Sequence, residues 1–297
     1  MEPQWPLILF TTLVAWSAGL FASQGALALK GEGRAAQLPA LICSAALLAA
    51  GGIAVSFHLE HWERVFNGFG HLTSGITQEL VAIVVMALVM VVYFAQLRRS
   101  ENGSVPTWIA VLALISAALL VVVMGNSYLM AARPAWNSAL QICSLIGAAC
   151  VLGPATLAVL EDVVAGDASE TASPVSVGSA AFAVWGSVIN LVTTGAFLLG
   201  MTTASSSLTD VGYSFDPTRP EAGLLDLASI SPFAGESALI AGGALVAALL
   251  AVIVALLARA KGGWKSWGAL IVICAFACTV LARVVFYQMG VSVFLYY

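Results

Sequence analysis

The feature that most limits the fold of this chain is a series of apolar runs, each long enough to cross a lipid bilayer. A transmembrane helix needs about 20 mostly apolar residues to span a hydrocarbon core of about 30 Å. Only 9% of the 297 residues are charged, whereas soluble domains carry roughly 25%. Backbone groups in lipid must be hydrogen-bonded internally, so a spanning segment is a helix or part of a closed barrel. Strand-like alternation is absent from the runs, and we therefore predict an all-α integral membrane protein.

The apolar runs predict eight transmembrane helices that pack as one bundle and form a single domain. Two long segments between them, residues 58–74 and 203–235, are expected to lie outside the membrane, and the second is long enough to form a surface rather than a linker. The N-terminal residues lack the basic region of a secretory signal, so we expect the first span to be retained. The predicted spans cover residues 5–29, 37–57, 75–97, 107–130, 138–160, 175–202, 236–258 and 267–290.

The distribution of basic residues predicts the orientation of the bundle. Cytoplasmic loops of membrane proteins carry an excess of Lys and Arg. Three basic residues fall on the side that holds the two long loops, namely Arg64, Arg133 and Arg219, and Arg283 lies within the last span. This bias places both termini and both long loops on the non-cytoplasmic side. The other side holds seven: Lys30, Arg34, Arg98, Arg99, Arg259, Lys261 and Lys265.

Charged residues at or inside the predicted spans mark a candidate site. An ionisable side chain at the centre of a membrane helix costs about 2.5–3.5 kcal/mol on insertion scales, so such residues are functional by default. Glu79 lies near the start of the third span, Arg283 in the outer half of the last span, and His58 at the outer end of the second. Three helices thus bring ionisable groups to a similar depth, as a binding pocket between helices requires.

These residue types suit the oxidation of a quinol. A quinol headgroup loses protons as its electrons leave, so its site needs proton acceptors. Histidine titrates near pH ~6.5, and a carboxyl group in apolar surroundings takes up a proton near neutrality. We therefore predict that His58 and Glu79 accept protons. Arg64 or Arg283 would stabilise an anionic form of the quinol.

Structural roles for the same residues remain open at this stage. His58 at a helix end is equally typical of an interfacial cap, Arg64 of a side chain that reaches lipid phosphates, and Arg283 of a structural partner for Glu79. A zinc site made by the three histidines is a weaker hypothesis, because their spacing matches no common zinc pattern. A b-type haem is weaker still, because no histidines face each other across the bundle.

Two alternatives belong to other functional classes. A secondary transporter of a small anion or metal would show broken helices and mid-span charges, and neither is clear here. A subunit that only tethers its partners, without quinol chemistry, is the second alternative. The cysteines form no Cys-x-x-Cys motif and are expected to pack within the spans; they are Cys43, Cys143, Cys150, Cys274 and Cys278.

Several motifs resemble the membrane-anchor subunits of the dimethyl sulfoxide reductase family. The resemblance extends over nearly the whole length and is most specific in the first hundred residues and the last span. It departs from the family pattern at Glu60-His61-Trp62, where glycine-serine-proline is usual. The matching motifs are Gln4-Trp-Pro-Leu-Ile-Leu-Phe10, His58-Leu59 followed by Arg64, Phe66 and Asn67, Gln78-Glu79, and Ala282-Arg-Val-Val-Phe-Tyr287.

The resemblance implies a haem-free anchor that binds menaquinol and contains no iron–sulfur cluster of its own. His58, Arg64 and Glu79 match the quinol-site residues of that family. Electrons would pass to an iron–sulfur subunit and then to a molybdopterin catalytic subunit, so the terminal reduction would occur in another chain. Those partners would dock on the loops outside the cytoplasm, in the cytoplasmic membrane of a prokaryote. With protons released and the acceptor reduced on the same side, the reaction would move no net charge across the bilayer, and no nucleic-acid partner is expected.

Overall fold

The computed structural model describes residues 3–58, 71, 73–166, 175–204 and 230–291. Eight long helices and one short 3-10 turn, Arg34–Ala36, account for their regular structure, and these residues contain no strand. All eight helices are long and apolar enough to cross a membrane, which confirms the predicted all-α, eight-helix class. The helices are α1 (Trp5–Lys30), α2 (Gln37–Ser56), α3 (Gly75–Arg99), α4 (Thr107–Ser127), α5 (Ala139–Ala165), α6 (Val177–Thr202), α7 (Gly235–Lys261) and α8 (Trp264–Gln288).

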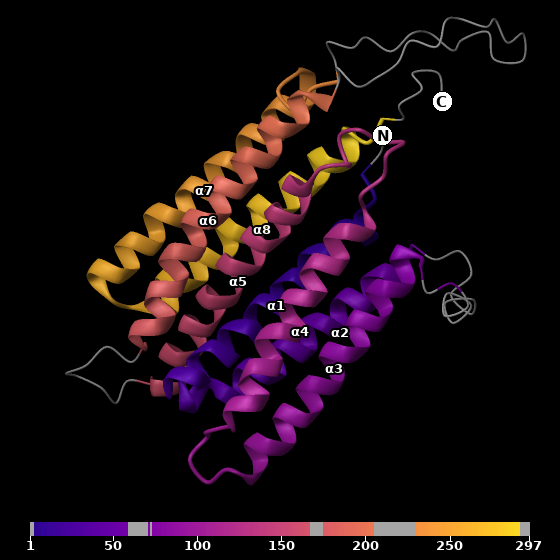
Figure 1. Ribbon diagram of the computed structural model, residues 1–297. Coiled ribbons are helices and arrows are strands. Elements are labelled where there is room, and N and C mark those ends of the chain that lie inside the picture. Colours follow the sequence, from indigo (N-terminus) through magenta and orange to yellow (C-terminus); the bar gives the residue numbers. More distant parts are fainter. Residues whose placement is uncertain (1–2, 59–70, 72, 167–174, 205–229, 292–297) are drawn as a thin grey trace, which may run out of the picture.

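The helices are arranged as two halves that meet along the centre of the bundle. Helices α1–α4 form one half and α5–α8 the other, and α1 lies beside α5 where the halves meet (Figure 1). Both termini lie at the same end of the bundle (Figure 1). We call it the terminal end; it holds the starts of the odd-numbered helices and the ends of the even-numbered ones. The other end is called the opposite end.

Glycines allow α1, α5 and α6 to pack backbone against backbone. A methyl group added at Gly19 would overlap the backbone of Ala149, and one added at Gly186 would overlap the carbonyl oxygen of Cys150. Pro154 lies inside α5 and has no N–H, so the Cys150 carbonyl lacks its usual helical partner. Close approach of small residues is the main way in which membrane helices gain contact. The centre of the bundle therefore depends on these glycines.

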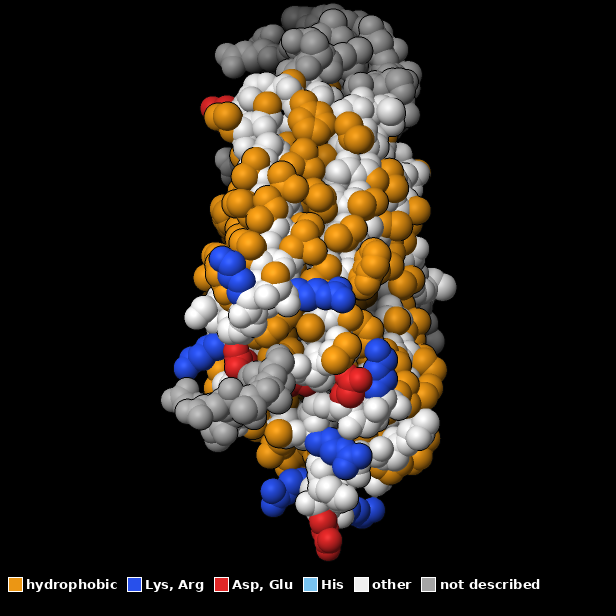
Figure 2. All heavy atoms as spheres, turned by 90° about the vertical axis from the view of Figure 1, so that its left-hand side faces the viewer, with side chains coloured by type: hydrophobic (Ala, Val, Ile, Leu, Met, Phe, Trp, Pro, Cys, Tyr) orange, Lys and Arg blue, Asp and Glu red, His pale blue; other side chains and the backbone are white. Residues whose placement is uncertain are grey.

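The opposite end carries most of the described basic side chains. Figure 2 shows Lys and Arg side chains gathered in the lower part of the molecule, below a broad hydrophobic surface. Lys30 closes α1, Arg98 and Arg99 close α3, and Arg259 and Lys261 close α7. The bundle is thus asymmetric in charge along its axis.

Candidate functional site

Two ionisable side chains are buried near the terminal end. Glu79, on the second turn of α3, is 8% exposed, and Arg283, six residues from the end of α8 counted inclusively, is 2% exposed. Each lies between one and two turns from the terminal end of its helix. Burying such groups is costly unless hydrogen bonds or opposite charges compensate. The contacts of each side chain therefore indicate how it is used.

Glu79 is held by the end of α4. The hydroxyl of Ser127 donates a hydrogen bond to Glu79 Oε1 at 2.9 Å. This contact needs a close approach of the two helices, which Gly75 permits, because a Cβ atom at Gly75 would lie 2.9 Å from the Cβ atom of Ser127. The first turn of α3 therefore has a glycine where it crosses α4, and the carboxyl group follows one turn later.

Ser127 has a second acceptor within reach. Its Oγ also lies 2.9 Å from the carbonyl oxygen of Met124, while a hydroxyl has only one proton to donate. When Glu79 is ionised, Ser127 can donate to it. When Glu79 is protonated, the carboxyl can donate to Ser127, whose own proton then goes to the Met124 carbonyl. The Ser127 hydroxyl can therefore hydrogen-bond to Glu79 in both its protonated and its ionised form.

Arg283 is bound differently and does not pair with Glu79. Its Nη2 donates to the Oγ of Ser144 on α5 at 3.0 Å. Its guanidinium lies over the rings of Phe286 and Phe197, with 5.0 and 5.9 Å from Cζ to the ring centroids. Nη1 is buried and has no hydrogen-bond partner among the described residues. The structure therefore leaves part of a buried cation available for another group.

Two tyrosines lie near both Glu79 and Arg283. Tyr128 follows the end of α4 and Tyr287 is one turn after Arg283 on α8; both are within electrostatic reach of both charged groups. Their rings pack in an aromatic group, since Tyr128 contacts Phe286 at 5.9 Å between centroids. Neither tyrosine was among the residues predicted from the sequence. The spacing of Tyr287 from Arg283 was a signal for it, because residues four apart share a helix face.

Gln141 is a further residue that the sequence analysis missed. It lies one turn before Ser144 on the same face of α5, is fully buried, and neither its Oε1 nor its Nε2 has a partner among the described residues. An uncharged amide in the first turn of a predicted span was too weak a signal to single it out. We call the whole group the polar cluster: Glu79, Ser127, Tyr128, Gln141, Ser144, Arg283 and Tyr287.

The other predicted site residues lie outside this cluster or outside the described residues. His58 is exposed just beyond the end of α2, where its backbone N–H donates to the Val55 carbonyl at 3.0 Å. Arg64 and His61 are outside the described residues, as is most of each long loop. His71 is described and exposed. Within the described ranges, no three side chains of His, Cys, Asp or Glu gather as a metal site would require.

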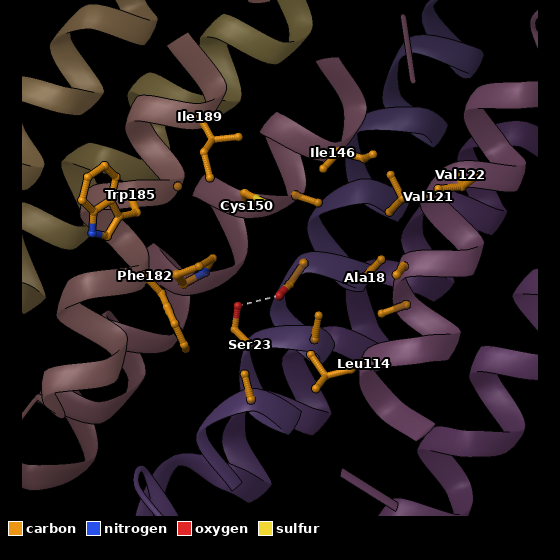
Figure 3. A pocket seen from close by; sticks show the side chains of 18 residues that line it. Ala18, Ser23, Leu114, Val121, Val122, Ile146, Cys150, Phe182, Trp185 and Ile189 are labelled. Carbon is orange, nitrogen blue, oxygen red and sulfur yellow. Dashed lines mark hydrogen bonds between the residues drawn. The ribbon is translucent and has the colours of Figure 1, made fainter. Parts of the chain in front are cut away.

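A separate apolar groove lies in the middle of the bundle. It has a volume of about 360 Å³ and is formed between α1, α4, α5 and α6, with Trp185 and Phe182 on one side and Leu114 on another (Figure 3). Ser23 supplies a hydroxyl to its lining, and that hydroxyl donates to the Gly19 carbonyl at 2.7 Å (Figure 3). The groove therefore suits a hydrocarbon chain, whereas the groups that can move protons lie in the polar cluster.

A family model described as DMSO reductase anchor subunit (DmsC) matches residues 1–289, which is nearly the whole chain. A search of curated proteins found no match.

Proposed function

We propose that this chain, which belongs to the DMSO reductase anchor subunit (DmsC) family by its match over residues 1–289, oxidises a quinol inside the membrane. As a member of that family, it is the membrane anchor of a DMSO reductase complex and associates with catalytic and electron-transfer subunits. Eight helices make it a multi-pass membrane protein. The proposal concerns what the anchor does besides holding the complex at the membrane.

The observation that carries the proposal is the burial of Glu79 and Arg283 near one end of the bundle. Glu79 can still take up a proton there, and Arg283 can still donate a hydrogen bond. Glu79 is supported by a hydroxyl that suits either protonation state, and one nitrogen of Arg283 has no partner among the described residues. A purely structural ion pair would join the two groups directly, yet each bonds a serine instead. Quinol oxidation requires a carboxyl that can take a proton and a cation that can hold an anion.

Each residue of the proposed site has a role that follows from its chemistry. Glu79 accepts one proton from the quinol, and Arg283 stabilises the negative charge that develops on the headgroup. We assign His58 as the second proton acceptor, at the mouth of the site, and Arg64 as a second electrostatic partner, as the family resemblance implies. A quinol supplies two electrons and two protons when it is oxidised, and the electrons leave for the iron–sulfur subunit.

We also propose an orientation for the bundle and a surface on which the partners dock. Because the basic residues gather at the opposite end, we place that end in the cytoplasm and the polar cluster on the outer side. Partners then dock on the loops of the terminal end, residues 58–74 and 203–235, beside the quinol site. Protons are released on the outer side and the reaction is electroneutral. Menaquinol in the cytoplasmic membrane of a prokaryote is the proposed substrate.

Replacing the proton acceptors tests the proposal. Glu79→Gln keeps the shape of the side chain and removes its proton-accepting oxygen, so we expect quinol-dependent reduction of the partner subunits to fall at least 100-fold in the purified complex. His58→Ala should have a similar effect. Subunit content, measured on the same preparations, should not change.

The matched control is Glu236→Gln, which alters an exposed carboxylate in the first turn of α7 at the same end. It should oxidise quinol at the wild-type rate. If Glu79→Gln and His58→Ala also do so, the site assignment is wrong. The tethering alternative is tested separately: a wild-type complex that shows no saturable quenching of a fluorescent menaquinol analogue would have no quinol site.

A further inference from the structure

The part of the polar cluster between α5 and α8 contains buried polar atoms that nothing in the described structure satisfies. Gln141 Oε1 and Nε2 and Arg283 Nη1 all lack a hydrogen-bond partner there. The Tyr287 hydroxyl has no partner in normal hydrogen-bond geometry among the described residues, although it lies close enough to Tyr128 to interact with it. The three side chains are 0%, 2% and 2% exposed. Buried polar groups are hydrogen-bonded in the large majority of cases, so each exception calls for an explanation. Four such atoms on two facing helices indicate a binding site.

The positions of these residues bring the four atoms to one region. Helices α5 and α8 pack against each other and run in opposite directions, and the hydrogen bond from Arg283 to Ser144 fixes their register. From that bond, Gln141 is three residues nearer the terminal end on α5, and Tyr287 is four residues nearer on α8. At 1.5 Å per residue these steps are about 4.5 and 6 Å. Gln141 and Tyr287 therefore lie at a similar depth, one turn beyond the Arg283–Ser144 pair.

The chemistry of the unpartnered atoms defines what would bind there. Arg283 Nη1 and Gln141 Nε2 are donors, and the Tyr287 hydroxyl donates or accepts. A buried guanidinium favours an oxygen that carries negative charge, because hydrogen bonds to ionised acceptors are roughly twice as strong as neutral ones. Gln141 Oε1 supplies one acceptor for a hydroxyl that is still protonated. The set thus matches the oxygen of a phenol-type hydroxyl in both of its protonation states.

We propose that Gln141, Arg283 and Tyr287 form a second headgroup subsite, which binds the quinol oxygen opposite the one whose proton Glu79 accepts. This inference rests on the proposed function and adds Gln141 and Tyr287 to the residues that contact the substrate. Tyr128 links Glu79 to the subsite, because it interacts electrostatically with Glu79, Arg283 and Tyr287. The two oxygens of one aromatic ring are then held by groups from α3 and α4 at one side and from α5 and α8 at the other.

The key experiment measures binding and stability on the same variant. Gln141→Met replaces the amide by an apolar side chain of similar length in the purified complex. Saturable fluorescence quenching of a menaquinol analogue should show at least a tenfold rise in Kd. The thermal midpoint of the complex should stay the same or rise, because the change removes unpaired buried polar atoms. A residue that only supports the fold would show the reverse pattern.

Two further variants complete the design. Tyr287→Phe removes a single oxygen and should also weaken binding of the analogue, by about threefold or more. Thr279→Val is the matched control, since Thr279 is buried one turn before Arg283 and its hydroxyl donates to the Ala275 carbonyl of its own helix at 2.8 Å. Its Kd should equal that of the wild type. If Gln141→Met does not assemble, the Kd of Tyr287→Phe decides whether the subsite binds the headgroup.

The outcomes separate this inference from the proposed function. A wild-type complex that binds no analogue overturns the proposed function. Wild-type binding with unchanged Kd in both Gln141→Met and Tyr287→Phe overturns the subsite alone. Unchanged Kd together with a lower thermal midpoint would mean that the four atoms bond internal water, and this result also overturns the subsite.

Discussion

At the scale of single residues, Ser127 should matter for the reaction as well as for the fold. Its hydroxyl is the hydrogen-bond partner that the structure gives to Glu79, and a hydrogen bond to a charged group contributes about 1.5–3 kcal/mol. We expect Ser127→Ala to lower the rate of quinol oxidation by about tenfold, since 1.4 kcal/mol corresponds to a factor of ten. Steady-state assays of the purified complex measure this rate.

Ser116→Ala provides the control for that prediction. Ser116 is buried on the same helix, and its hydroxyl donates to the Ala113 carbonyl within α4 at 3.3 Å. It should retain the wild-type rate. Equal rates in the two variants would show that the Ser127 hydroxyl does not assist Glu79.

Sequence reasoning finds the charged members of the polar cluster and misses the neutral ones, for a physical reason. Glu79 and Arg283 stand out because a charge inside an apolar run is costly and therefore rare. Gln141 and Tyr287 do not stand out, because amides and tyrosines near the ends of membrane helices commonly face the interface. Whether such a residue points inward depends on helix rotation, which only the packing of α5 against α8 reveals.

At the scale of helices, the junction of α5 and α6 should be sensitive to any added side chain. A Cβ atom added at Gly186 would overlap the Cys150 carbonyl oxygen, which Pro154 leaves without a helical partner. Gly186→Ala would force the two backbones apart, and overpacking of this kind costs about 1–3 kcal/mol. The thermal midpoint of the purified complex should fall accordingly. Gly242→Ala on α7 is the control, because a Cβ atom there meets nothing within 4 Å. An equal fall in the thermal midpoint of both variants would show that packing between α5 and α6 is not the cause.

The helices themselves follow from hydropathy, but their exact ends do not, and the end of α5 differs most. The predicted fifth span stops at residue 160 because Glu161 and Asp162 follow it, while the structure continues α5 to Ala165. Glu161 is buried there, and its Oε2 accepts hydrogen bonds from the backbone N–H and the hydroxyl of Ser176, each at 3.1 Å. A carboxylate that caps the start of the next helix can lie within a membrane-spanning helix. A charged residue in the sequence is therefore not enough to locate the end of a span unless the hydrogen-bond partners of that residue are known.

At the scale of the whole molecule, hydropathy fixes how many helices cross the membrane but not which helices adjoin. The central position of α1 and α5 depends on the small residues where they meet, such as Gly19 against Ala149, and small residues are spread over most of the spans. The joining of Glu79 and Arg283 into one cluster depends on this arrangement. It brings the end of α4 beside the end of α8, although Tyr128 and Phe286, whose rings are in contact, are far apart in the sequence.

The orientation of the bundle is the last prediction, and it concerns the molecule as a whole. Seven of the eleven basic residues fall at the opposite end, in the terminal turns of helices or between them, so that end should face the cytoplasm. In intact cells, a membrane-impermeant maleimide should label Glu236→Cys, which lies at the terminal end, and should label Glu101→Cys only after permeabilisation. The parent protein is the control, since its five cysteines lie within the helices. The reverse pattern would place the polar cluster on the cytoplasmic side, and the protons of the quinol would then be released there.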